Sequence, residues 1–299
     1  MALVPFDDRD GFIWLDGKLI PWRDATLHVL THGLHYASGV FEGERAYAGH
    51  IFRLRTHTDR LINSGRILGF EIPYTADEID AACVAVLAAN NLTDGYLRPI
   101  AWRGSEMLAV SAQNTKIHLA IAAWTWPAYF ENRMAGIALD WAEWRRPDPA
   151  TSPTASKATG NYMIGTLSKH KAEAAGFADA MMLDWRGRLS EATGANVFLA
   201  IDGALHTPTP DCFLDGITRR TVMALARRRQ IPVIERVILP EELDQAQEVF
   251  LAGTAAEVTP VRQIAERHFT PGQMTETLVK DYEALVRMAP AEVEARLAV

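Results

Sequence analysis

The chain has 299 residues, of which 48% are hydrophobic and 22% charged, and its formal net charge is −7. This composition is typical of a globular protein with one large domain or two medium ones. The acidic balance argues against nucleic acid or an anionic membrane as the main partner.

The sequence indicates no membrane or secretory segment. No stretch of about 18 apolar residues occurs, so we expect no transmembrane helix. Residues 1–10 lack the apolar run of a signal peptide. Cys83 and Cys212 are the two cysteines, which rules out a disulfide framework or a CxxC metal pattern. We therefore expect a cytoplasmic protein.

Residues 1–127 are predicted to form an N-terminal α+β domain. Two strand-like runs flank Asp16-Gly17, which is a strong hairpin signal. The sequence Thr75-Ala-Asp-Glu78 is a capping box that would open a helix. Strands are expected near 11–15, 18–22, 35–47, 51–54, 96–103 and 116–124, and helices near 57–68 and 75–90.

A linker is predicted at 128–134, followed by a C-terminal domain over 135–299. Residues 145–156 are rich in Pro, Ser and Thr and predict a loop. Strands are expected near 136–144, 179–185, 195–201, 204–207, 232–238 and 247–252, and helices near 160–175, 217–230 and 275–288. We find no internal repeat.

Lys157 differs from the other five lysines because all its neighbours are small: Thr-Ala-Ser-Lys157-Ala-Thr-Gly-Asn. A large ligand could approach such an amine closely, and a desolvated lysine can attack a carbonyl. The local sequence is also compatible with an ordinary surface-loop lysine.

Glu191 lies among small residues in Leu-Ser-Glu191-Ala-Thr-Gly-Ala-Asn196. A carboxylate there could keep the pyridine nitrogen of a cofactor protonated and so strengthen its electron-withdrawing power. The alternative is a solvated turn glutamate.

Three features could bind an anion. Gly216-Ile217-Thr218 precedes an apolar-periodic helix and would offer backbone N–H groups, although a plain N-cap by Asp215 or Thr218 is equally compatible. Residues 253–257 could form a second nest of N–H groups, or a simple tight turn. Arg60, on the predicted helix 57–68, could add a positive charge or form a surface ion pair.

Together these parts suit a carbonyl cofactor that carries a phosphate. The sequence contains no HExxH, GxSxG or Walker A motif. The nine histidines lack a convincing metal-ligand spacing, so we expect no metal.

These motifs resemble those of the class IV, or fold-type IV, pyridoxal-phosphate (PLP) enzymes. Within that class the sequence resembles the branched-chain amino-acid aminotransferases. The resemblance extends over nearly the whole chain. It is carried by eight ordered blocks: 28–36, Val40-Phe-Glu-Gly43, His57-Thr-Asp-Arg60-Leu61, Tyr96-Leu-Arg98-Pro99, 157–162, Leu189-Ser-Glu191 with Asn196, Gly216-Ile-Thr218-Arg219 and 253–260.

The resemblance implies a two-domain α/β fold of the α+β type, with PLP in the interdomain cleft and Lys157 as the catalytic Schiff-base lysine. Glu191 would pair with the pyridine nitrogen and Tyr162 with the phenolic oxygen. The implied cofactor-binding residues are Arg60, Lys157, Tyr162, Glu191, Asn196, Gly216, Ile217, Thr218 and Thr254. Sites in this family are completed across a dimer interface, which implies a homodimer or higher homo-oligomer.

The implied substrates are branched-chain L-amino acids, with 2-oxoglutarate as the amine acceptor. An apolar pocket with one arginine would accept both an aliphatic side chain and a distal carboxylate. The expected substrate-binding residues are Tyr36, Phe41, Arg45, Tyr96, Arg98, Thr254, Ala255 and Ala256, with Trp126 as a further candidate for the wall.

The same scaffold also supports R-selective amine and D-amino-acid transaminases, which we keep as the alternative. Ile100 stands where the D-amino-acid enzymes have a histidine, and Arg98 stands where the amine transaminases usually lack an arginine. Residues 102–110 and the pair Glu44-Arg45 depart from the branched-chain pattern, which leaves the substrate range open. A non-catalytic binding protein is disfavoured because Lys157 is retained.

Overall fold

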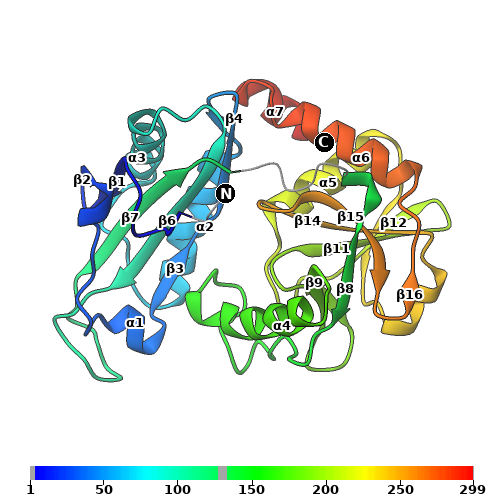
Figure 1. The fold of residues 1–299 in the computed structure, drawn as a ribbon, viewed down its shortest axis with the longest axis horizontal. Coiled ribbons are helices and arrows are strands. Elements are labelled where there is room, and N and C mark those ends of the chain that lie inside the picture. The colour runs from blue at the N-terminus through cyan, green and yellow to red at the C-terminus, as the bar shows by residue number, and fades with distance from the viewer. Residues whose placement is uncertain (1–3, 127–132, 299) are drawn as a thin grey trace. The chain divides into compact units, whose positions relative to one another are not determined.

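The computed structural model describes residues 4–126 and 133–298, and these residues form two compact units (Figure 1). Within them, the first unit comprises 4–126 together with Ser156–Gly160, and the second comprises 133–155 and 161–298. The grouping of Ser156–Gly160 with the first unit differs from the predicted domains, whose boundaries stay a prediction. Most of the predicted linker 128–134 lies outside the described residues, and Arg133–Ala135 form a 3-10 helix, η2.

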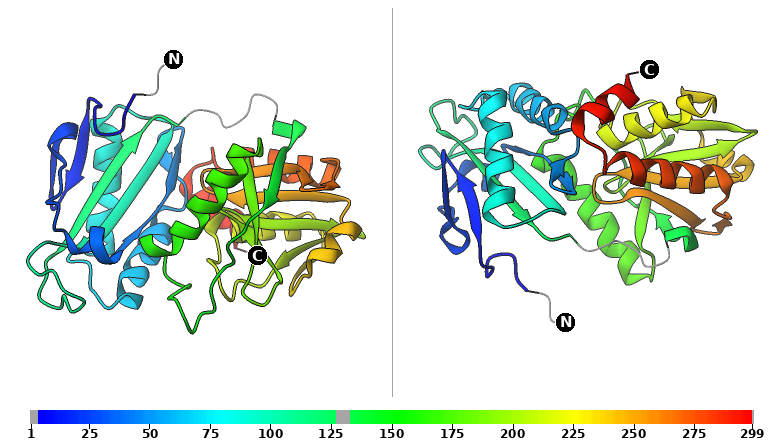
Figure 2. Two further views of the ribbon diagram at one scale, coloured as in Figure 1. Left: turned by 60° about the horizontal axis from the view of Figure 1, so that its bottom comes forward. Right: turned by 90° about the horizontal axis from the view of Figure 1, so that it is seen from above.

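The first unit is built on a seven-stranded sheet in which every strand pair is antiparallel. Helices α2 (Leu54–Ile67) and α3 (Ala76–Ala89) pack against one face of this sheet (Figure 2). The strands follow the order β2 (Lys18–Pro21), β1 (Phe12–Leu15), β7 (Ile117–Trp124), β6 (Gly95–Arg103), β4 (Glu44–Tyr47) and β5 (His50–Ile51), and β3 (Gly39–Phe41) also pairs with β6.

The two faces of β6 have different side chains. Leu97 and Ala101 are buried in the core under α2 and α3. Because side chains alternate along a strand, Tyr96 and Arg98 lie on the opposite face. Paired residues share a face, so Phe41, whose partner is Ile100, also lies on the face away from the helices.

The predicted hairpin at Asp16-Gly17 is confirmed, with Leu15 opposite Lys18 and positive φ values at both turn residues. The strand predicted over 35–47 is wrong at its start. Residues His32–Tyr36 form a short helix, α1, which ends in a left-handed Ala37 before β3 begins at Gly39. Five helical residues are too few to produce a clear helical period in the sequence. A 3-10 helix, η1, covers Trp22–Asp24.

The second unit is built on a nine-stranded mixed sheet. Its strand order closes into a ring, because β10 pairs with both β9 and β11. The order is β10 (Leu189–Ala192), β9 (Asp179–Leu183), β8 (Ile137–Trp141), β15 (Glu257–Ile264), β14 (Glu248–Gly253), β11 (Asn196–Ile201), β12 (Ala204–Pro208) and β13 (Val233–Arg236), and β16 (Arg267–His268) pairs with β15.

The second unit's helices are α4 (Met163–Ala174), α5 (Ile217–Arg228), α6 (Gln273–Leu285) and α7 (Pro290–Leu297). Two further 3-10 helices are η3 (Thr159–Tyr162), which begins in the first unit's segment, and η4 (Pro240–Gln245). The sequence did not predict β10, β15 or α7. Among the described residues, no helix combines the length and apolar character needed to cross a membrane.

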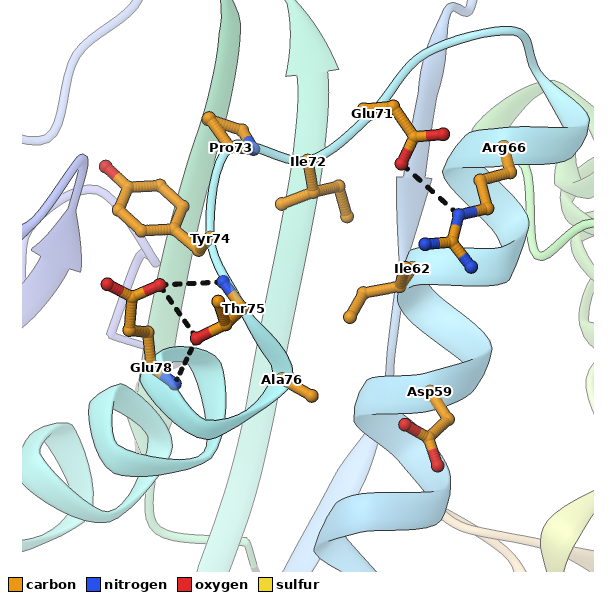
Figure 3. A pocket seen from close by; sticks show the side chains of 10 residues that line it. All are labelled: Asp59, Ile62, Arg66, Glu71, Ile72, Pro73, Tyr74, Thr75, Ala76 and Glu78. Carbon is orange, nitrogen blue, oxygen red and sulfur yellow. Dashed lines mark hydrogen bonds and ion pairs between the residues drawn. The ribbon is translucent and has the colours of Figure 1, made fainter.

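The predicted capping box of α3 is confirmed. The Thr75 hydroxyl accepts the Glu78 N–H at 3.3 Å, and the Glu78 carboxylate accepts the Thr75 N–H at 2.7 Å. Figure 3 shows this box at one side of a groove that α2 lines with Asp59, Ile62 and Arg66.

Thr75→Ala removes the hydroxyl acceptor at the start of α3, and we expect it to lower the free energy of unfolding by about 1 kcal/mol. Urea denaturation measures the loss. Glu276→Gln, in the first turn of α6, is the control and should change stability by less. Equal stability of Thr75→Ala and the natural protein would show that the box contributes nothing.

Candidate functional site

The segment that carries Lys157 is held by hydrogen bonds to the first unit. The Lys157 N–H donates to the Ser64 hydroxyl at 3.0 Å, and the Lys157 carbonyl accepts the Phe41 N–H at 3.1 Å. Ala158 forms a bridge with Val40. The Thr159 hydroxyl bonds to the carbonyls of Ala37 and Gly39. The loop lysine of the sequence is therefore fixed at its backbone, beside β3.

Lys157 and Arg98 both lie against the aromatic ring of Phe41. The Lys157 Nζ lies 5.0 Å from the centroid of Phe41, and the Arg98 guanidinium carbon lies 4.7 Å from the same centroid. Arg98 Nη2 also donates to the Tyr96 hydroxyl at 3.1 Å. Tyr96 in turn stacks on Trp126, with ring centroids 4.7 Å apart. This unit thus places an amine, a guanidinium and an aromatic wall together.

The other two predicted substrate residues of this unit lie at different places. Arg45 is opposite Tyr96 in the β4–β6 pairing, and its guanidinium lies 4.9 Å from the Tyr47 ring. Tyr36 is on α1, 47% exposed, and stacks on His32. Arg45 therefore shares the face of Tyr96, whereas the stacking contact of Tyr36 lies within its own helix.

Arg60 is held by a buried carboxylate. Glu42 is fully buried and accepts hydrogen bonds from Arg60 Nε at 2.7 Å and Nη2 at 2.8 Å, and from His57 Nδ1 at 2.7 Å. Burial alone would raise the pKa of Glu42, but the Arg60 charge and hydrogen bonds, with those of His57, outweigh it and hold that pKa below its ordinary value. Arg60 is thus a positioned cation rather than a surface ion-pair partner.

Glu44 is a second buried carboxyl in the same region. Among the described residues, neither of its oxygens has a hydrogen-bond partner. Burial raises the pKa of Glu44 well above its ordinary value, and the charges of Glu42 and Asp80 raise it further. Burial therefore favours the protonated form of Glu44.

In the second unit, Glu191 and Asn196 face each other across β10 and β11. Asn196 Nδ2 donates to Glu191 Oε2 at 3.0 Å and to the Leu214 carbonyl at 3.1 Å. Both side chains are buried. The alternative of a solvated turn glutamate is excluded, because Glu191 lies inside the unit with defined partners.

Arg146 links Glu191 to the residues before α4. Its Nε lies 3.0 Å from Glu191 Oε1, and its Nη1 donates to the Asn161 carbonyl at 3.3 Å. Its Nη2 bonds to the Thr193 carbonyl at 3.0 Å. Tyr162 follows Asn161 and is the N-cap of α4. Arg146 thus connects Glu191 with the segment that carries Tyr162.

The start of α5 packs against Asn196. A Cβ at Gly216 would lie 2.2 Å from Asn196 Oδ1, so only glycine fits there. Gly216 is the N-cap of α5 and makes no side-chain cap hydrogen bond, while Asp215 pairs with Arg219 instead of capping. The N–H groups of the first turn, including those of Ile217 and Thr218, have no partner within the helix. They form a position suited to an anion.

The turn Thr254–Ala255–Ala256 joins β14 to β15. Gly253, just before it, packs against Gly194 and Ala195, which precede β11. The β11–β14 pairing places Asn196 opposite Ala252. The strand pairings therefore bring the start of this turn close to Asn196.

The structure thus assembles two groups of predicted site residues. The first unit holds Lys157, Arg60, Phe41, Tyr96 and Arg98, and the second holds Tyr162, Glu191, Asn196, Gly216–Thr218 and Thr254–Ala256. The sequence assigned no role to Glu42 or Arg146. Arg146 lies in a Pro-rich loop, where no periodic pattern could indicate its burial. Glu42 is part of a recognised block, but its partners come from a helix fifteen or more residues away.

Comparison with known proteins identifies the family to which the chain belongs. The profile of the family Amino-transferase class IV matches residues 39–264. The chain belongs to this family.

Class IV relatives cover almost the whole chain. The branched-chain-amino-acid aminotransferase of Pseudomonas aeruginosa is 44% identical over 288 residues, which span 93% of this chain and 94% of that protein. The structure of the branched-chain aminotransferase from the archaeon Thermoproteus uzoniensis with norvaline matches with a TM-score of 0.90 at 36% identity, over 95% of this chain and 97% of that one.

A third relative is the T.th. branched-chain amino acid aminotransferase complexed with N-(5'-phosphopyridoxyl)-L-glutamate. It matches with a TM-score of 0.91 at 35% identity, over 96% of this chain and 97% of that one. The predicted fold-type IV architecture is confirmed by these class IV matches.

Glu44→Gln should change how stability depends on pH. Below about pH 4.3, Glu44 is protonated in both the folded and the unfolded natural chain. Above it, only the unfolded chain ionises, so the natural protein loses about 1.4 kcal/mol per pH unit relative to the variant until the raised folded pKa is reached.

Urea unfolding at pH 5 and pH 7 measures this difference. The stability of Glu44→Gln relative to the natural protein should rise between the two pH values. Glu71→Gln, at an exposed carboxyl, is the control and should show no such rise. A Glu44→Gln difference that is the same at both pH values would show that Glu44 is ionised in the folded state.

Proposed function

We propose that the protein is a branched-chain amino-acid aminotransferase that uses PLP and transfers the amine of L-leucine, L-isoleucine or L-valine to 2-oxoglutarate in a ping-pong reaction. Relatives of this activity extend over 93% or more of the chain. The observation that carries the proposal is the placement of the Lys157 amine and the Arg98 guanidinium against the same Phe41 ring.

The residues present fit the cofactor. An amine, a buried carboxylate and a helix start that only glycine permits are the donors and acceptors that an aldehyde, a pyridine nitrogen and a phosphate require. PLP supplies the carbonyl carbon and the electron-withdrawing ring. The solved T.th. enzyme is bound to a phosphopyridoxyl compound, which supports the same cofactor here.

Each residue has a defined task in this proposal. Lys157 binds the cofactor's aldehyde carbon and later moves the proton from the substrate's Cα. Glu191 keeps the pyridine nitrogen protonated, because Arg146 and Asn196 hold its carboxylate in place. Tyr162 donates a hydrogen bond to the phenolic oxygen. The phosphate is bound by Arg60, Thr254, Gly216, Ile217 and Thr218.

In this proposal the substrate pocket lies on the face of β6 that points away from α2 and α3. Phe41, Tyr96 and Trp126 supply an apolar wall for an aliphatic side chain. Arg98 binds the distal carboxylate of glutamate or 2-oxoglutarate, and Arg45 on the neighbouring strand adds positive charge. Thr254, Ala255 and Ala256 bind the α-carboxylate. The location of the cofactor in the cleft between the domains stays a prediction.

We propose that the protein acts as a homodimer or higher homo-oligomer. The first unit exposes large apolar side chains near α1: Leu34 is 66%, Tyr36 47% and Val110 86% exposed. The His32 ring connects these segments, because its Nε2 lies 2.9 Å from the Ala109 carbonyl. Exposed apolar patches of this kind mark association surfaces. A second copy covering this patch would place Tyr36 at the subunit boundary, where it could complete a substrate site.

The proposed location is the cytoplasm. Cys83 and Cys212 are both free and buried, which fits a reducing compartment.

A donor panel tests the proposed function. L-leucine with 2-oxoglutarate should be turned over, whereas D-alanine and (R)-1-phenylethylamine with pyruvate should not. Lys157→Ala should lower turnover by about 10⁴-fold and remove the absorption band that the lysine–aldehyde linkage gives the bound cofactor, because no amine remains to bind the aldehyde.

Lys169→Ala is the matched control, because Lys169 lies on α4 and contacts Asp179 and the Ala178 carbonyl. It should retain normal turnover. Turnover of D-alanine or the amine, with none of L-leucine, would replace the proposal with an R-selective amine or D-amino-acid transaminase.

Arg98→Ala should impair the acidic substrates selectively. Loss of charge-assisted hydrogen bonds costs about 1.5–3 kcal/mol, so kcat/KM for 2-oxoglutarate and glutamate should fall by about 10- to 100-fold, with a smaller fall for leucine. Steady-state kinetics with each substrate measure the two effects, and Arg98→Lys should recover part of the loss. Equal losses for leucine and glutamate would assign Arg98 a purely structural role.

A further inference from the structure

Ser64 is a buried helical serine whose hydroxyl bonds outside its own helix. It lies on α2 and is fully buried. A serine inside a helix commonly bonds back to the carbonyl four residues earlier. Ser168 does this in α4, where its hydroxyl donates to the Ile164 carbonyl at 2.8 Å. Ser64 instead accepts the N–H of Lys157, a residue 93 positions away in sequence.

The contact between Ser64 and this segment has two hydrogen bonds, and Ser64 is the acceptor in both. The Ser64 hydroxyl accepts the Lys157 N–H at 3.0 Å, and the Ser64 carbonyl accepts the Ser156 hydroxyl at 3.0 Å. Ser156 is also buried. Together the two bonds attach the Ser156–Lys157 peptide to α2.

This attachment determines where the lysine side chain begins. A lysine amine sits on a flexible four-carbon stem, so the position of the backbone limits the region that Nζ can reach. The Lys157 carbonyl is held by the Phe41 N–H, and its N–H is held by Ser64. Of these two partners, only the Ser64 hydroxyl belongs to a side chain.

The same helix also carries Arg60. Residues four apart lie on the same helical face, so Ser64 and Arg60 share one side of α2. Glu42 accepts two hydrogen bonds from Arg60, which fixes that guanidinium relative to β3. Helix α2 therefore sets the distance between the segment that carries Lys157 and the Arg60 guanidinium.

We propose that Ser64 is a positioning residue for Lys157: its hydroxyl fixes the backbone from which the reacting amine projects, at a set distance from Arg60. The proposal rests on the proposed function of Lys157. Loss of the Ser64 hydroxyl would let the Lys157 backbone move and would leave the residues of the substrate pocket unchanged. A small displacement of a reacting group lowers the rate of the chemical step more than it weakens substrate binding.

Hydrogen exchange in the cofactor-free protein tests the contact directly. The Lys157 amide should exchange slowly in the natural chain. In Ser64→Ala it should exchange up to about tenfold faster, because the loss of one hydrogen bond lowers the local opening free energy by about 0.5–1.5 kcal/mol. Ser168→Ala, which removes another buried helical hydroxyl, should leave the Lys157 amide unchanged.

Kinetics of the PLP-loaded enzyme test the consequence. Ser64→Ala should lower kcat about tenfold with KM for L-leucine within about twofold, and it should shift the pH at which the bound cofactor's visible absorption changes. Ser156→Ala, which removes the second bond and leaves the Ser64 hydroxyl in place, should have a smaller effect in the same direction. If Ser64→Ala fails to fold, Ser64→Cys replaces it, because a thiol fills similar space and is a weaker hydrogen-bond acceptor than a hydroxyl.

Two results would overturn the proposal. One is an unchanged exchange rate of the Lys157 amide in Ser64→Ala, or in Ser64→Cys if Ser64→Ala fails to fold. The other is faster exchange with natural kcat and an unshifted absorption titration. If the natural protein turned over no amino donor, the proposed function would fail instead, and the exchange rates would still decide whether Ser64 holds Lys157.

Discussion

Compensation of buried charge is the constraint on which the two groups of site residues depend. A buried ion is costly unless it is paired and hydrogen-bonded. Glu42 meets this requirement through Arg60 and His57 in the first unit, and Glu191 through Arg146 and Asn196 in the second. In each unit the pairing leaves a charged group in a defined orientation. Removal of Arg60 or Arg146 would leave a buried carboxylate without its arginine partner.

The alternation of strand side chains separates the structural and chemical roles within the first unit. Leu97 and Ala101 fill the core under the helices, whereas Tyr96 and Arg98 on the same strand face away from it. Changes on the face that carries Tyr96 and Arg98 therefore leave the helix-packed core undisturbed, and under the proposed function they would alter substrate preference.

The sequence predicted the architecture well wherever a local signal was strong. The Asp16-Gly17 turn and the Thr75–Glu78 box each follow from a few adjacent residues, and both are confirmed. The short helix α1 was missed because its five residues show no clear period. The family was identified because ordered blocks along the chain resemble it, and the match to residues 39–264 confirms that identification.

The partners within the site could not be predicted, because they depend on contacts between distant segments. Nothing near Arg146 in the sequence indicates that it forms an ion pair with Glu191 and donates a hydrogen bond to the Thr193 carbonyl. Likewise, nothing in the sequence distinguishes Ser64 from an ordinary helical serine, and only the structure shows its contact with Lys157. The roles of these residues in catalysis stay predictions.

The close approach of Gly216 to Asn196 restricts the order in which substitutions can accumulate. Asn196 cannot swing aside to admit a methyl group, because two hydrogen bonds hold its amide. Alanine at position 216 would be harmful in the natural background but tolerable after a smaller residue had replaced Asn196. A smaller residue there would in turn weaken the support of Glu191. The effect of a substitution at position 216 would therefore depend on the residue at position 196, and the two positions would be constrained together.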